Sequence, residues 1–397
     1  MDADLNSPLW INKDFFTTVI RYHTADAKAD VKDFLIKPSL AIGEHYPSTM
    51  FRADINYSTS SKPSNSLSVV IKFPRSNGDA VLLSPLFEIE QDMYNGPLSD
   101  IKLLLESVGD FSNIQPKLIY QTLRPIQVIV MEDLGAKGFV KITQQLEHYE
   151  ESKMVFERLA KFHAASFFLL NERKADYSRF KSSIFHLEDE LIRETWFNES
   201  IDTLAEVLAT WEGFGEYSTR LKAFKGKYLD LAQKLYEPDV NGYNVLSHSD
   251  FHVKNLLFKL NGGIAEDCYF LDYQISAVLS PCADLFYALY NMISDENRRN
   301  RREEIIHDYH NEFVATLKRL GFIGRIPTLL DLQMDLMKHG FMEVLKCVSY
   351  KMFFYAESVE MFAAADTRSV KTKIFNDPRF KAFITTELPR LVRLGFL

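Results

Sequence analysis

The stretch LSHSDFHVKNLLF at residues 246–258, followed by FLDYQ at residues 270–274, is the part of this sequence that indicates the fold. It sets Asp250 five residues before Asn255, and a second aspartate, Asp272, ends the next apolar run. In phosphotransferases the first aspartate accepts the proton of a substrate hydroxyl, while the asparagine and the second aspartate hold the metal ion that neutralises the phosphates. The apolar residues around them predict short buried strands, which would fix these polar groups at a rigid edge.

A plainer interpretation of the same residues is a capped turn followed by an ordinary strand end. The complete pattern favours the catalytic interpretation, because an apolar run that ends in an aspartate follows Asn255 after 17 residues. His252 stands two residues after Asp250 and has two open interpretations. It donates a hydrogen bond to the transferred phosphate, or it packs against the loop.

Length and composition describe an ordinary globular protein. The 397 residues suffice for two or three lobes, and 46% of them are hydrophobic and 25% charged. A formal net charge of −8 gives no general attraction to nucleic acid. The acidic N-terminus and the lack of an apolar run of membrane length predict a cytoplasmic location without membrane insertion, and no obligate protein partner is indicated. The three cysteines are expected to be buried free thiols.

The order of the periodic patterns predicts an α+β fold with two lobes. A helical pattern at 8–23 precedes strand-like alternation at 51–57, 67–73 and 126–131, with a hairpin loop at 58–66 and one helix at 84–107. Helical patterns then dominate, at 144–171, over most of 185–237, and at 281–294, 303–320 and 328–365. We therefore expect a small antiparallel β-rich N-terminal lobe (1–131), a hinge (132–135) and a larger, mostly α-helical C-terminal lobe (136–397). The basic cluster at 298–302, followed by two glutamates, is expected to be the solvated, ion-paired start of a helix.

The first lobe contains residues suited to handling a nucleotide. Lys72 sits inside an apolar strand, and Glu90 follows 18 residues later on a helical pattern. A strand lysine paired with a helix glutamate holds the α- and β-phosphates in kinases, although Lys72 could instead extend its head from an edge strand to water. A turn at 43–50 with the Ser48 and Thr49 hydroxyls could cover the phosphates, or could be an ordinary hairpin turn. The backbone from Glu132 to Leu134 could read an adenine edge.

Taken together, these residues resemble a known family, the ecdysteroid-kinase-like proteins of arthropods, within the wider choline/aminoglycoside-kinase-like group of protein-kinase-like folds. The resemblance covers nearly the whole chain, and it rests on Trp10, 43–52, Lys72, Phe87, Glu90, Tyr94, 132–134, LAKFHAAS at 159–166, the pattern from His248 to Asn255, 271–274 and 284–285. The sequence departs from the usual family pattern at His45, Ser249 and Tyr273.

The resemblance implies ATP-dependent phosphorylation of a hydroxyl on a small molecule, typically a steroid hormone or a foreign compound, for hormone inactivation or detoxification. Carried over by position, Asp250 would be the catalytic base, and Asn255 and Asp272 would hold Mg²⁺. Lys72 and Glu90 would form the phosphate-holding pair. His248 would brace the catalytic loop and Asp284 would anchor the helix behind it.

Other acceptors and a non-catalytic role remain open. The same chemistry could serve choline, ethanolamine or an aminoglycoside, and the fold could also bind a nucleotide or a hormone without turnover. A protein substrate is not expected, because no Ala-Pro-Glu follows Asp272 and the next helix starts too soon for a long activation segment. The acceptor pocket is expected among the helices of the second lobe.

Overall fold

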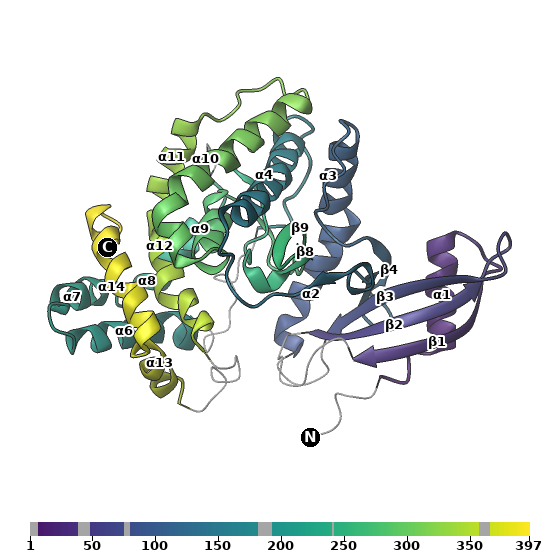
Figure 1. Cartoon of the computed structure of the whole chain (residues 1–397), viewed down its shortest axis with the longest axis horizontal. Coiled ribbons are helices and arrows are strands. Elements are labelled where there is room, and N and C mark those ends of the chain that lie inside the picture. The colour runs from purple at the N-terminus through teal and green to yellow at the C-terminus, as the bar shows by residue number, and fades with distance from the viewer. Residues whose placement is uncertain (1–6, 39–47, 75–79, 182–192, 240–241, 357–365) are drawn as a thin grey trace.

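The computed structural model describes residues 7–38, 48–74, 80–181, 193–239, 242–356 and 366–397. An antiparallel sheet forms the N-terminal part, in the order β1 (Asp30–Pro38), β2 (Ser48–Ser58), β3 (Asn65–Pro74), β5 (Val128–Glu132) and β4 (Leu118–Thr122) (Figure 1). Every predicted strand is present, and the predicted hairpin loop joins β2 to β3. Residues of β2 alternate between buried and exposed, so Phe51, Ala53 and Ile55 face the core that the sheet shares with helix α1 (Lys13–Thr24).

The predicted single helix at 84–107 is wrong in one respect. It is two helices, α2 (Ala80–Asn95) and α3 (Pro97–Glu106), separated at Gly96. Pro97 has no backbone N–H to continue the ladder of α2, but it suits the first turn of a new helix. The break turns the chain, so that α2 packs on β3 while α3 packs on α4 of the helical part.

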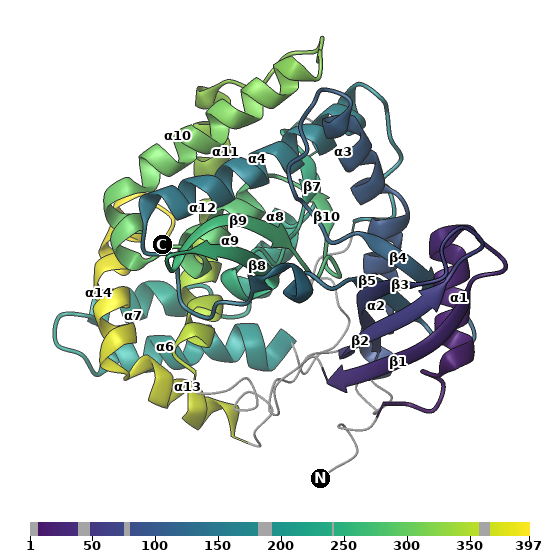
Figure 2. The same ribbon diagram turned by 45° about the vertical axis from the view of Figure 1, so that its right-hand side comes forward.

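The remainder is mostly helical, as predicted (Figure 2). It comprises α4 (Tyr149–Asn171), α6 (Glu199–Ala209), α7 (Gly215–Lys222), α8 (Tyr228–Leu235), α9 (Cys282–Asn291), α10 (Asp295–Arg319), α11 (Leu329–Lys338), α12 (Gly340–Leu345), α13 (Thr367–Phe375) and α14 (Pro378–Arg393). Short irregular helices complete it, including η1 (Gly135–Lys137), η3 (Arg193–Asn198), η5 (Lys346–Tyr350) and η6 (Lys351–Phe354). The sequence patterns did not predict α13 and α14.

Short strands interrupt the helices where the sequence predicts them. Strand β7 (Val245–Ser247) pairs with β10 (Ala277–Leu279), and β8 (Leu256–Asn261) pairs with β9 (Ile264–Phe270) and with β6 (Phe139–Val140). The 3₁₀ turn η4 (Val253–Asn255) leads into β8. The loop that carries Asp250 is therefore held between β7 and β8, and Asp272 follows β9. The α+β, two-lobed arrangement is confirmed, and the proposed lobe boundary at 132–135 stays a prediction.

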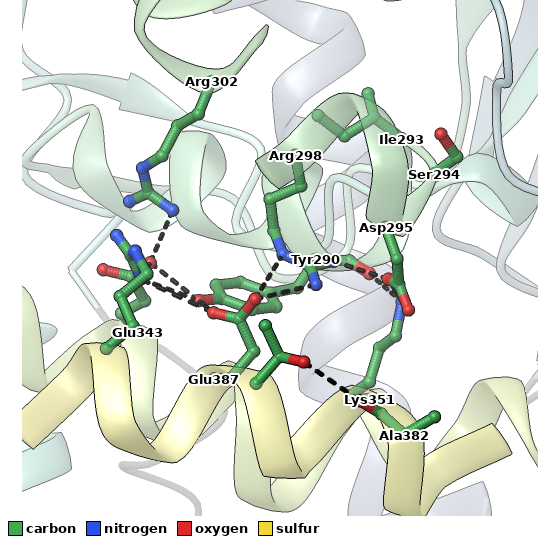
Figure 3. Close-up of polar contacts among 12 residues, drawn as sticks. Tyr290, Ile293, Ser294, Asp295, Arg298, Arg302, Glu343, Lys351, Ala382 and Glu387 are labelled. Carbon is green, nitrogen blue, oxygen red and sulfur yellow. Dashed lines mark hydrogen bonds and ion pairs between the residues drawn. The ribbon is translucent and has the colours of Figure 1, made fainter. Parts of the chain in front are cut away.

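The basic cluster does not form a solvated helix start. Helix α10 begins earlier, at Asp295, with Ser294 as its N-cap, so the cluster lies within its first turns. Arg298 is only 2% exposed and pairs with Glu387 of α14 at 3.0 Å and with Asp295 at 2.6 Å (Figure 3). Arg302 pairs with the buried Glu343 of α12. The predicted ion pairing is present locally, as between Arg301 and Glu304 at 2.8 Å. The predicted solvation is wrong for Arg298 and Arg302, because their partners Glu387 and Glu343 lie on helices that fold back onto α10.

The cysteines are free and buried, as predicted. Burial raises the pKa of the Cys282 thiol well above its ordinary value, so the thiol keeps its proton. Cys282 Sγ lies 3.3 Å from Asp335 Oδ2, and this oxygen also accepts a hydrogen bond from Ser280. Among the residues described, no helix combines the length and the apolar composition needed to cross a bilayer.

Candidate active site

A cleft of about 430 Å³ separates the N-terminal sheet from the β8–β9 region, a volume suited to a cofactor or a small ligand. Its walls include most residues that the sequence assigned to nucleotide or metal binding, though not Thr49: Ser48, Lys72, Glu90, Glu132, Leu134, Asn255 and Asp272. Arg52, Lys141 and Lys254, which the sequence did not single out, also line it. Residues 43–47 of the predicted phosphate turn lie outside the described residues, and Ser48 begins β2.

Lys72 binds two carboxylates inside this cleft. Its Nζ lies 2.5 Å from Glu90 Oε2 on α2 and 2.7 Å from Asp272 Oδ1 after β9. The side chain is nearly fully buried, so the alternative in which Lys72 reaches out to water is wrong. Burial opposes the charge, but the attraction of Asp272 and Glu90 outweighs it and raises the pKa of Lys72.

Glu90 titrates differently from its partner. Burial raises the pKa of Glu90 to about 7, against the attraction of Lys72, and the nearby charge of Asp272 adds to the rise. Two carboxylates thus share a single ammonium, which leaves this corner of the cleft one negative charge in excess when both are ionised. A cation at Asp272 would relieve that excess.

The backbone around Asp272 is unusual. Asp272 has φ 66°, in the left-handed region that costs a non-glycine residue about 1 kcal/mol or more. Neighbouring contacts enforce this conformation: Leu271 donates its N–H to Asn255 O at 2.8 Å, and His248 Nε2 lies 2.8 Å from Leu271 O. His248 thereby links the catalytic loop to the strand end that carries Asp272.

Asp250 and Asn255 face each other across the loop. Asn255 donates from Nδ2 to Asp250 Oδ2 at 2.8 Å and to Asp250 O at 3.0 Å. Tyr287 of α9 donates its hydroxyl hydrogen to the Asp250 carboxylate. Burial would raise the pKa of Asp250, but the charge and hydrogen bond of His252, the charge of His248 and the hydrogen bond of Tyr287 outweigh burial and lower this pKa well below its ordinary value. Asp250 is therefore ionised in neutral solution, and its role as the base that accepts a hydroxyl proton stays a prediction.

For His252 the predicted roles are a hydrogen bond to the transferred phosphate and packing against the loop. Its Nε2 is 3.5 Å from Asp250 Oδ1, and its ring stacks at a tilt on Tyr287, with centroids 5.4 Å apart. Its Nδ1 accepts the N–H of Lys254 at 3.2 Å and so caps η4. The ring packs within the loop, and its contact with a transferred phosphate stays a prediction.

A buried carboxylate holds the catalytic loop from behind. Asp284, at the first turn of α9, accepts the backbone N–H of His248 at 2.7 Å and that of Ser249 at 2.6 Å. His163 of α4 lies 3.0 Å from the same carboxylate through Nε2, and its Nδ1 is 2.8 Å from the Tyr309 hydroxyl. His163 is thus a core histidine behind the loop with both ring nitrogens in polar contact. Ser249 has φ 69°, in the left-handed region that glycine adopts without strain.

The hinge offers less to an adenine than the sequence suggested. Glu132 donates its N–H to Lys117 O at 3.0 Å, and Asp133 donates its own to Ser68 O at 3.1 Å. Gly135 donates its N–H to Asp133 Oδ1 at 2.8 Å, so three of the four hinge N–H groups are already bound within the protein. Leu134 remains our candidate for contact with the base.

Sequence reasoning missed two residues beside Asp250. Tyr287 lies 37 residues and Lys346 lies 96 residues after Asp250, and neither belongs to a local motif with it. A signal existed for Lys346 alone, because it is a single charge inside the apolar run VLKCV at 344–348. That run predicted burial, but it gave no information about the neighbours.

Two solved structures show a distant similarity to the chain over most of its length. A single-residue mutant of an aminoglycoside 2'-phosphotransferase-IIIa, solved with GDP, is 15% identical with a TM-score of 0.42, covering 94% of this chain and 98% of its own. An ethanolamine kinase of Plasmodium vivax is 13% identical with a TM-score of 0.39, covering 88% of this chain and 83% of its own. We draw no conclusion about the acceptor from similarities this distant. No curated protein sequence matches the chain.

The family comparison is decisive. The sequence model of the ecdysteroid kinase-like family matches residues 42–322, which is more than half of the chain and includes the whole constellation from Lys72 to Asp284. The chain therefore belongs to the ecdysteroid kinase-like family, and it is a small-molecule kinase with a hydroxyl group as its acceptor.

Proposed function

We propose that this kinase transfers the γ-phosphoryl group of ATP to a hydroxyl of an ecdysteroid or of another lipophilic alcohol. The observation that carries the proposal is that Lys72, its two carboxylates and Asn255 line one cleft, and that Asn255 also holds Asp250 by a hydrogen bond behind the cleft wall. The family description supports a steroid alcohol as the acceptor.

Each residue has a proposed role in an in-line transfer. Lys72, held by Glu90, steadies the α- and β-phosphate oxygens. Asp250 orients the acceptor hydroxyl and takes its proton late, as the new O–P bond forms and the bond between the γ-phosphorus and the ADP oxygen breaks. Ser48 contacts the phosphates, and Leu134 and the hinge carbonyl of Glu132 contact the base.

The donor atoms on the far side of the cleft suit magnesium. Asp272 offers a carboxylate and Asn255 an amide oxygen, which are the hard oxygen ligands that Mg²⁺ prefers. We propose these two residues as its ligands, and the ion would neutralise the phosphate charge. The excess negative charge around Lys72 supports this assignment.

The test is transfer of labelled phosphate from Mg-ATP to a panel of ecdysteroids, plant phenolics, choline, ethanolamine and an aminoglycoside. We expect label on a lipophilic alcohol, and a loss of about 10³-fold or more in kcat for Asp250→Asn with little change in ATP affinity. Label only on choline, ethanolamine or the aminoglycoside would show that the acceptor is one of these compounds and not a lipophilic alcohol. ATP binding without label on any acceptor would favour the non-catalytic binding module, and equal activity of Asp250→Asn would remove Asp250 from its role.

A further inference from the structure

Tyrosine side chains that do not line the nucleotide cleft lie around Asp250. Tyr287 of α9 donates to the Asp250 carboxylate, and its ring lies 5.1 Å from that of Tyr350 in η5. Tyr236, which follows α8, is a third ring nearby. None of these tyrosines, nor Asp250 itself, is among the residues that line the nucleotide cleft. An acceptor that approaches Asp250 from the side of these tyrosines, while ATP fills the cleft, brings its hydroxyl next to their rings.

An aromatic group next to a carboxylate is the arrangement that binds organic ammonium ions. Here the position of the cation is already taken. The Nζ of Lys346 lies 3.7 Å from the centre of the Tyr287 ring, 3.8 Å from that of Tyr350 and 5.6 Å from that of Tyr236. These are close cation–π distances, and they place the lysine head where a trimethylammonium or an amine of a substrate would sit.

Burial of the Lys346 ammonium is unfavourable for its charge. Lys346 is 1% exposed, and across the part of the chain that the structure describes its Nζ forms no hydrogen bond and no ion pair within 4.0 Å. The nearest opposite charges that act on it are Asp250 and Asp284. A buried ammonium without a hydrogen-bond partner is unfavourable for folding, so packing alone gives no reason for a lysine at this position.

We propose that Lys346 determines acceptor specificity by occupying the ammonium position of the tyrosine group and so excluding cationic acceptors. This inference rests on the proposed kinase function and deepens it. Choline, ethanolamine and amine-rich sugars would have to displace the lysine head or sit beside it, and both are opposed by sterics or by like charge. Uncharged alcohols meet no like-charge repulsion, and an acceptor oxygen can receive a hydrogen bond from the lysine.

A matched pair of ligands tests the proposal. Choline and 3,3-dimethylbutan-1-ol have the same shape and differ in the charge of the central atom. Their binding to the full chain, saturated with Mg²⁺ and a non-hydrolysable ATP analogue, is measured by ligand-observed NMR titration. We expect the wild type to bind the uncharged alcohol at least 10-fold more tightly than choline. Lys346→Ala, which empties the position, should gain choline affinity by at least 10-fold, whereas Lys346→Met, which keeps the volume filled, should gain much less.

Several results would overturn the proposal. Choline binding by the wild type as tight as that of the alcohol would do so, as would an unchanged or absent choline affinity in Lys346→Ala. Folding of each variant is checked by its affinity for the ATP analogue, and Lys346→Ser replaces Lys346→Ala if the latter does not fold. Phosphate transfer is measured in parallel. Transfer to choline by the wild type would confirm the kinase and refute the role of Lys346, whereas no transfer to any acceptor would count against the proposed function while the binding ratio still reports on Lys346.

Discussion

Two buried lysines five residues apart should respond to the same substitution by different amounts. Lys346 lies among tyrosine rings without a hydrogen-bond partner among the described residues. Lys351 is equally buried, but its Nζ lies 2.9 Å from Asp295, 2.9 Å from Tyr290 O and 3.2 Å from Gln145 Oε1 (Figure 3). Methionine has nearly the same length as lysine and carries no charge. Each Lys→Met change therefore isolates the contribution of the ammonium.

The magnitude for Lys346 follows from its pKa. Burial lowers that pKa to about 7, against 10.5 for an ordinary lysine, although Asp250 and Asp284 oppose the fall. A pKa difference of one is equivalent to about 1.4 kcal/mol, so burying this ammonium costs about 4 kcal/mol at pH 7. The two close tyrosine faces return about 1–2 kcal/mol. We expect Lys346→Met to raise the free energy of unfolding by about 2 kcal/mol.

The control should change stability much less. Burial lowers the pKa of Lys351 only to about 8, because Asp295 opposes the fall, so the cost of burying this ammonium is about 3 kcal/mol. Lys351→Met also removes three charge-assisted hydrogen bonds and leaves Asp295 with Arg298 as its remaining partner, a loss of similar size. We expect the free energy of unfolding of Lys351→Met to differ from that of the wild type by no more than about 1 kcal/mol. Both variants are compared with the wild type by urea unfolding at pH 7, with circular dichroism as the signal.

The pH dependence supplies a second check. Because the folded pKa of Lys346 lies below the unfolded value, the unfolded state holds more protons between pH 7 and about 10. The free energy of unfolding of the wild type therefore rises relative to that of Lys346→Met over this pH range, and the difference between the two proteins becomes smaller. The charged and titratable groups around the lysine, Asp250, Asp284 and the tyrosines, are present in both proteins and cancel in the comparison. A Lys346→Met variant less stable than the wild type at pH 7, or a gap that does not change up to pH 9, would refute the reasoning.

Three further predictions concern other parts of the molecule. Lys72→Met should lower kcat/KM for ATP by about 100-fold or more, because it removes the charge that faces the phosphates; unchanged steady-state kinetics would contradict the proposed role. Glu387→Gln should lower the free energy of unfolding, measured with urea, by about 3 kcal/mol, because it weakens the ion pair of the buried Arg298. Arg299→Ala, at an exposed position, should change it by less than about 0.5 kcal/mol. Equal effects of the two variants would show that the buried ion pair does not stabilise the fold. Ser249→Gly should keep kcat within about 3-fold and unfold at the same or slightly higher urea concentration, because glycine accepts φ 69° without strain; a large loss of activity would mean that the serine side chain is needed.

The sequence predicted those parts of the site that depend on short spacings. Asp250, Asn255 and Asp272 lie within one strand–loop–strand unit, so the apolar runs between them fix their relation. Lys72 and Glu90 were predicted as a pair because strand and helix follow each other directly. The break at Pro97 was predictable in principle, since proline interrupts a helical ladder, yet the apolar period runs through it.

The remainder depends on contacts between distant segments. The partner of Arg298 is 89 residues away on α14, and the tyrosine ring beside Lys346 comes from α9, 59 residues earlier. The period of a helix shows which face is buried, but it does not identify the helix packed against that face. The partners of these buried charged side chains were therefore unknown until the helices were placed in space.

The Lys72–Asp272 contact has a consequence for how the two lobes move. Lys72 and Glu90 belong to the N-terminal part, whereas Asp272, Asp250 and Asn255 are held by β8, β9 and the buried Asp284 behind them. Rotation of the N-terminal sheet away from β8 and β9 would separate Lys72 from Asp272, whereas the Lys72–Glu90 pair and the Asp250–Asn255 pair would each be kept. Helix α3, which packs on α4, would stay with the helical part in such a rotation. We expect an opening of this kind to uncover the cleft without disturbing the loop that Asp284 holds.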